Sequence, residues 1–260
     1  MNHGSLFSGI GGFDLAAEWM GWTNIFQVEW DSYCQKVLKK NFKNVELYGD
    51  IKEFKGEKYR GIVDIISGGF PCQPFSHAGK RQGKADDRYL WPEMLRIISE
   101  VKPSFVIGEN VTGLVSMENG KTLERIFADL ENEGYQTESF IIPACSVGAW
   151  HRRDRIWIIA YSGSPIHFEY VGKCGVQNER ENQKGIGSSH WGKFIMVNGR
   201  MAPEKWKHEG YGIDTRPLLC RNLDGISSGL DRLKGLGNAI VPQVAFELFK
   251  AIETVNNLLK

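Results

Sequence analysis

One cysteine stands in a setting that favours chemistry. Cys72 lies in the stretch Gly-Gly-Phe-Pro-Cys-Gln-Pro-Phe-Ser (residues 68–76), soon after the apolar run 62–66. Such a run, rich in β-branched side chains, predicts a buried strand of a parallel sheet. Ligands of open α/β sheets bind outside the carboxyl ends of the strands. Pro71 and Pro74 keep the loop extended, so the thiol is placed to act as a nucleophile, although a cysteine in an ordinary turn is more often inert.

A carboxylate and two arginines follow at the ends of other apolar runs. Glu109 comes at the tip of the predicted strand 104–111, and Arg153 and Arg155 come just before the predicted strand 156–160. A carboxylic acid whose pKa is raised by burial can donate a proton near neutral pH, and a guanidinium can bind a phosphate or a carbonyl oxygen. Taken alone, a capping acid and an exposed charge cluster explain these residues as well.

A glycine turn near the N-terminus predicts a cofactor site. The pattern Gly9-x-Gly11-Gly12-x-Asp14 lets a backbone turn approach a ligand at the start of a helix. Asp14 stands where a dinucleotide fingerprint has its third glycine, which counts against NAD or FAD. Glu29 ends the predicted strand 25–29, where its carboxylate could accept hydrogen bonds from ribose hydroxyls.

These blocks resemble, in order, the motifs of the cytosine-5 DNA methyltransferases. The resemblance rests on Pro71-Cys72-Gln73, Glu109-Asn110-Val111, Arg153-x-Arg155 and the Gly237-Asn238-Ala239 turn, and it covers residues 3–160 and 216–250. The chain departs from the family at His151, where the family has glutamine, so the role of this position stays open.

The resemblance implies a role for each block. Cys72 would attack carbon 6 of a flipped-out cytosine, Glu109 would hold N3 and the exocyclic amine, and Arg155, with Arg153 beside it, would contact O2. Asn110 would position the nucleophile loop. The implied DNA-contacting residues are Ser76, Lys80, Arg81 and Lys84. The implied S-adenosylmethionine-binding residues are Phe7, Gly9, Gly11, Glu29, Trp30, Asp50, Ile51, Pro71, Leu90 and Asn238.

Apolar periodicity predicts the elements that must position these residues. We expect an α/β, Rossmann-like methyltransferase fold with a mostly parallel seven-stranded sheet and helices on both faces. The catalytic and cofactor-binding domain would span residues 1–161, a short irregular target recognition region 162–215, and a returning segment 216–260. The predicted helices are 15–20, 32–41, 92–101, 123–133 and 243–259, the last one folding back onto the first strand.

Composition narrows the class of protein. The 260 residues are 42% hydrophobic, enough for a full core, with no apolar run long enough to span a membrane and no signal-peptide pattern, so we expect a cytoplasmic protein. Five widely spaced cysteines indicate neither a disulfide framework nor a zinc site, and no metal is needed. Residues 151–234 carry 14 Lys and Arg against 9 Asp and Glu, a modest excess that suits a polyanion.

The sequence thus predicts an enzyme that methylates carbon 5 of cytosine within a short sequence of double-stranded DNA, through a covalent Cys72 intermediate. We expect a monomer and leave open a cognate restriction endonuclease. Two alternatives stay open: methylation of structured RNA such as tRNA, and a catalytically silent DNA-binding or cofactor-sensing module. The intact Cys72, Glu109 and Arg155 argue against the silent module.

Overall fold

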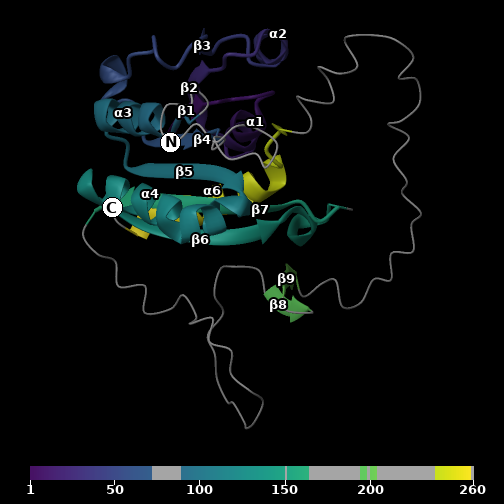
Figure 1. The fold of residues 1–260 in the computed structure, drawn as a ribbon. Helices are drawn as coiled ribbons and strands as arrows, with labels where there is room; N and C mark the ends of the chain where they lie inside the picture. Colours follow the sequence, from purple (N-terminus) through teal and green to yellow (C-terminus); the bar gives the residue numbers. More distant parts are fainter. Residues whose placement is uncertain (72–88, 150, 164–193, 198–199, 204–237, 259–260) are drawn as a thin grey trace, which may run out of the picture.

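The protein is built on one seven-stranded sheet. The computed structural model describes residues 1–71, 89–149, 151–163, 194–197, 200–203 and 238–258. The strands of the sheet are β1 (Asn2–Leu6), β2 (Thr23–Val28), β3 (Glu46–Tyr48), β4 (Ile65–Gly68), β5 (Phe105–Val111), β6 (Tyr135–Pro143) and β7 (Asp154–Ser162). Their order across the sheet is β3-β2-β1-β4-β5-β7-β6 (Figure 1).

The sheet is mostly parallel, as predicted. The pairs β3–β2, β2–β1, β1–β4 and β4–β5 are parallel, whereas β7 is antiparallel to both β5 and β6. The parallel strands therefore end at one edge, where the side chains that follow them can meet. The antiparallel register of β7 brings Arg155 opposite Val111, at the end of β5 that lies at this edge.

Helices cover both faces of the sheet, which confirms the predicted fold class. Among the described residues the helices are α1 (Gly12–Trp19), α2 (Ser32–Asn41), α3 (Trp91–Val101), α4 (Lys121–Asn132) and α6 (Pro242–Leu258), with short 3₁₀ turns η1 (Glu57–Tyr59), η2 (Thr112–Gly120) and η3 (Ala144–Val147). None of these helices combines the length and the hydrophobicity that crossing a bilayer requires.

Each face of the sheet carries its own hydrophobic core, because side chains of a strand alternate between the faces. Ile65 packs in one core with α1 and α6, and Ile66 packs in the other with α3 and α4. The terminal helix folds back onto the first strand as predicted: the ring of Phe249 on α6 meets the edge of His3 on β1, with ring centroids 5.7 Å apart. Residues near the two ends of the described chain thus complete one core together.

A small hairpin lies within the predicted recognition region. Strands β8 (Phe194–Val197) and β9 (Arg200–Pro203) pair antiparallel and form a sheet of their own. We predicted an irregular segment here and no strands. The rest of the predicted region after Gly163 lies outside the described residues, as do the segments 204–237 and 72–88.

Candidate active site

The glycine turn between β1 and α1 has the unusual backbone that its sequence predicts. Phe7, Gly9 and Gly11 have φ angles of 52°, 56° and 89°, in the left-handed region that favours glycine. At Gly11 there is also no room for a side chain, since a Cβ built there would lie 2.4 Å from Cε2 of Phe42. The turn is therefore pressed against the end of α2.

Glu29 lies at this turn, at the end of β2. Its Oε2 accepts a hydrogen bond from the amide of Gly9 at 2.6 Å, and its Oε1 accepts one from the amide of Asp31 at 2.7 Å. Burial raises the pKa of Glu29, and the two amide bonds oppose that rise. The carboxylate thus joins the glycine turn to the start of α2 and stays at the edge where a ribose is expected.

A cavity of about 350 Å³ opens beside this turn. Six of the ten residues predicted to bind the cofactor line it, although they come from five separate parts of the chain. Sequence reasoning missed three lining residues that stand next to predicted ones at strand ends. The lining residues are Phe7, Trp30, Asp50, Ile51, Pro71 and Leu90 from the prediction, and Val28, Gly49 and Lys52 besides.

Trp30 and Asp50 differ in how the protein holds them. The Trp30 side chain is 75% exposed, so its indole face is open to solvent or to a ligand. Asp50 accepts a hydrogen bond from the amide of Lys52 through Oδ1 at 2.9 Å, and its carbonyl accepts further amide bonds from the following turn. Asp50 therefore caps the turn that follows it and also lines the cavity.

The turn after β4 leads toward the predicted nucleophile. Asn110, at the end of β5, donates through Nδ2 to the carbonyl of Phe70 at 2.8 Å, and its Oδ1 accepts from the amide of Val111 at 2.8 Å. Asn110 is 4% exposed and its bond to Phe70 is shielded from water, whereas the bond from the Val111 amide is only partly buried. The structure thus brings Asn110 to the loop that it is predicted to position, two residues before Cys72.

Glu109 projects into the same place from β5 and is 9% exposed. Burial raises the pKa of its carboxyl to about 7, and the positive charges of Arg155 and Arg153 act against that rise. Nε of Arg155 lies 2.9 Å from Oε1 of Glu109. A carboxyl group that titrates near neutral pH beside a guanidinium can either hold or release a proton, as a general acid must.

Arg153 has a partner in the C-terminal segment. Its φ is 35°, and its Nη2 donates to the carbonyl of Ala239 at 2.8 Å. Burial and the charge of Arg155 lower the pKa of Arg153. We predicted Arg153 as a catalytic residue and did not foresee this bond, which joins the start of β7 to residues 86 positions later.

Comparisons with known proteins show the family to which the chain belongs. Residues 1–198 match the family described as C-5 cytosine-specific DNA methylase. The chain belongs to that family. It is 36% identical over 178 residues to the type II methyltransferase M.HaeII of Haemophilus aegyptius, covering 68% of this chain and 55% of that protein. It is 31% identical over 250 residues to M.NgoBI of Neisseria gonorrhoeae, covering 88% and 78%.

The chain spans about half the length of several of these relatives, for example 47% of M.HhaI of Haemophilus parahaemolyticus. The fold also matches the solved structure of the Entamoeba histolytica methyltransferase EhMeth with a TM-score of 0.60, at 16% identity and over 96% of this chain and 97% of that one. That likeness supports the fold alone.

Some of the predicted site residues have no described placement. Cys72 and the predicted DNA contacts Ser76, Lys80, Arg81 and Lys84 lie outside the described residues. Asn238 begins the described C-terminal segment with an exposed side chain and is not among the residues that line the 350 Å³ cavity.

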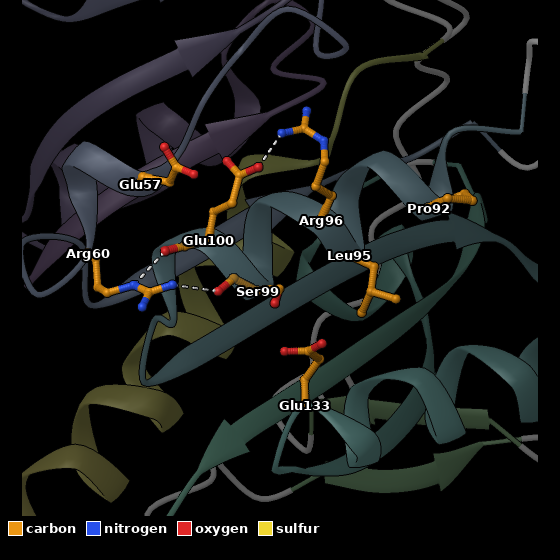
Figure 2. A pocket seen from close by; sticks show the side chains of 8 residues that line it. All are labelled: Glu57, Arg60, Pro92, Leu95, Arg96, Ser99, Glu100 and Glu133. Atoms are coloured by element: carbon orange, nitrogen blue, oxygen red, sulfur yellow. Dashed lines mark hydrogen bonds and ion pairs between the residues drawn. The ribbon is translucent and has the colours of Figure 1, made fainter.

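A second cavity, about 450 Å³, lies along α3, and none of the predicted site residues lines it (Figure 2). Its two arginines are held by other residues of the lining. Arg96 pairs with Glu100 at 2.6 Å, and Arg60 donates to the backbone carbonyls of Glu100 and Ser99. We assign it no part in the site. Its lining residues are Glu57, Arg60, Pro92, Leu95, Arg96, Ser99, Glu100 and Glu133.

Proposed function

We propose that this chain transfers a methyl group from S-adenosylmethionine to carbon 5 of a cytosine in double-stranded DNA. The observation that carries the proposal is the buried Glu109 carboxyl, with a pKa of about 7, beside Arg155 and at the turn that leads to Cys72. A protein that bound DNA or cofactor without chemistry would have no need of this grouping. Family membership adds weight to the proposal.

The residues around the 350 Å³ cavity fit S-adenosylmethionine. Apolar side chains such as Phe7, Ile51 and Leu90 suit a flat purine, and the open indole of Trp30 offers a stacking face. Gly9 and Gly11 let the backbone approach the amino acid portion, while Glu29 could accept hydrogen bonds from the ribose hydroxyls once a ligand competes for its oxygens. When bound, S-adenosylmethionine would supply an electrophilic methyl group.

The chain's own residues would prepare the cytosine. The base must leave the DNA stack for its carbon 6 to be reached, at a cost of roughly a few kcal/mol. The Cys72 thiolate would form a bond to carbon 6 while Glu109 donates a proton to N3 and Arg155 holds O2, so that electron density moves to carbon 5. Carbon 5 then bonds to the methyl group.

Release of the methylated base breaks the bond between Cys72 and carbon 6. Loss of the carbon 5 proton to water or hydroxide restores the double bond and expels the Cys72 thiolate, which leaves 5-methylcytosine. Glu109 takes back the N3 proton in this step and is ready for the next turnover. The site of methylation within DNA would be a short sequence read by the recognition region, which lies mostly outside the described residues.

The experiment measures labelled methyl transfer from S-adenosylmethionine to unmethylated genomic DNA, and in parallel to tRNA, by wild type and Cys72→Ala. We expect label in DNA with wild type and none with Cys72→Ala, which keeps its cofactor and DNA affinity. Cys145→Ala is the matched control, since Cys145 is a free, partly exposed thiol on η3 and should be replaceable without loss of activity.

Two outcomes would contradict the proposal. Label only in tRNA would move the function to RNA modification, and appreciable DNA methylation by Cys72→Ala would exclude the covalent route. A stable adduct with DNA that contains 5-fluorocytosine, formed by wild type and not by Cys72→Ala, would separate an enzyme from a silent binding module.

A further inference from the structure

The C-terminal segment, residues 238–241, reaches the active site from far along the chain. The Arg153 guanidinium holds it from one side through the 2.8 Å bond to the Ala239 carbonyl. From Pro242 the chain continues as α6, which packs on α1. The segment is thus fixed at both ends, and the side chains between these anchors are those of Ile240 and Val241.

Ile240 touches both turns of the site. A Cβ built on Gly12, at the start of α1, would lie 2.8 Å from the Cβ of Ile240 and 2.8 Å from its carbonyl oxygen. A Cβ built on Gly69 would lie 3.4 Å from Cδ1 of Ile240. Both glycines therefore leave room for Ile240, and one apolar side chain spans from the cofactor turn to the turn that leads to Cys72.

The same side chain stands close to Glu109. A Cβ built on Gly69 would lie 3.2 Å from Oε2 of Glu109. Oε2 of Glu109 and Cδ1 of Ile240 therefore lie on either side of the same small space. The charged groups that act on Glu109 among the described residues are Arg155 of β7 and Arg153, which directly precedes β7. The Gly69 turn and Ile240 contribute no charge, so apolar contact is what they add.

We propose that Ile240 is a positioning residue for methyl transfer: it holds the Gly12 and Gly69 turns at a fixed separation and closes one side of the Glu109 carboxyl to water. This inference rests on the proposed function, in which Glu109 donates a proton to the base. It predicts that truncating Ile240 lets water reach the carboxyl, which then ionises more easily.

The first test is the pH dependence of single-turnover methyl transfer to DNA. Activity needs protonated Glu109, so it falls as the pH rises through the pKa of that carboxyl. We expect Ile240→Ala to move this alkaline limb down by about one pH unit, which lowers the rate roughly tenfold at pH 8. Ile240→Val also lacks Cδ1 but keeps the branched side chain beside Gly12, so it should show a smaller shift in the same direction.

The second test does not depend on activity. Glutamate labelled with ¹³C at the side-chain carboxyl is incorporated, the Glu109 resonance is assigned by its loss in Glu109→Gln, and its titration is followed in wild type, Ile240→Ala and Ile240→Val. We expect the titration midpoint to fall most in Ile240→Ala and by a smaller amount in Ile240→Val. Val255→Ala is the matched control, because Val255 packs in the α1 and α6 core and lies outside the two turns.

The outcomes separate the two proposals. If wild type methylates neither DNA nor tRNA, the proposed function fails while the titration still decides the role of Ile240. An unchanged midpoint and an unchanged alkaline limb in Ile240→Ala would overturn the inference. Should Ile240→Ala fail to fold, Ile240→Thr keeps the branched shape and places a hydroxyl near the carboxyl, and the same absence of any shift would overturn the inference.

Discussion

The hydrogen bond from Asn110 to the Phe70 carbonyl makes a sharp prediction about the nucleophile loop. Asn110→Ala removes the donor at 2.8 Å from a site that is 4% exposed, and leaves the carbonyl without that partner. An unsatisfied buried polar group costs about 1–3 kcal/mol. The second bond, from the Val111 amide, costs less to lose, because Val111 is 45% exposed and water can replace the bond. We expect the free energy of unfolding to fall by about 2 kcal/mol.

The effect on catalysis should exceed the effect on folding. Phe70 is two residues before Cys72, and a displacement of about 1 Å at a reacting group can cost roughly 100-fold in rate. We expect single-turnover methyl transfer by Asn110→Ala to slow by about that factor, while the affinity for S-adenosylhomocysteine changes little, since Gly9 and Glu29 are held by separate bonds.

Asn110→Asp is the matched variant for this prediction. It keeps an oxygen for the Val111 amide but replaces the donor by an acceptor that faces the Phe70 carbonyl. It should therefore be at least as slow as Asn110→Ala, and urea unfolding should show at least the same loss of stability. A wild-type rate in Asn110→Asp would refute the view that this bond positions the loop.

Three further predictions concern other parts of the site and the fold. Gly11→Ala should destabilise the protein by about 3 kcal/mol or more and abolish cofactor binding, because backbone strain adds to a contact of 2.4 Å with the Phe42 ring. Gly9→Ala, which has open space around it, should cost only about 1 kcal/mol in urea unfolding. Equal losses of stability in the two variants would contradict this argument. His3 is fully buried with a pKa lowered to about 4, so the unfolded chain binds a proton at this residue first as the pH falls. Wild type should lose about 3 kcal/mol of unfolding free energy between pH 6.5 and 4 that His3→Asn does not lose. Parallel curves of unfolding free energy against pH in the two proteins would refute this. Trp30→Ala should weaken S-adenosylhomocysteine binding by about tenfold in calorimetry with no change in Tm, unlike Trp19→Ala, which should leave binding intact; unaltered binding in Trp30→Ala would remove the stacking role.

Much of the fold followed from periodicity and from the residues that break it. The apolar runs at 62–66 and 104–111 predicted strands that the structure places side by side as β4 and β5. Because parallel strands end at one edge, residues just after them can meet, and Phe7, Trp30 and Asp50 do line one cavity. The position of a residue just after a predicted parallel strand thus indicates from the sequence that it lies at the edge where ligands bind.

The contacts that sequence reasoning missed are those that depend on packing between distant segments. Arg153 bonds to Ala239 only because α6 returns across the sheet, and nothing in the local pattern of either residue indicates the other. Likewise Ile240 contacts both Gly12 and Gly69, although the three residues lie far apart in the sequence. The β8–β9 hairpin was missed because its residues show no alternation of apolar and polar side chains strong enough to predict strands.

The meeting of α1 with α6 has a consequence for how this protein is made. Trp22, just after α1, donates from its indole nitrogen to Glu253 of α6 at 2.9 Å, across 231 positions of sequence. At roughly 5–20 residues per second, the ribosome needs about 10–50 s to synthesise the chain between them. During that interval the apolar face of α1, with Phe13, Ala16 and Ala17, has no α6 to cover it. This core is therefore completed only after α6 has emerged from the ribosome, so the final packing of this face of the sheet is post-translational or nearly so.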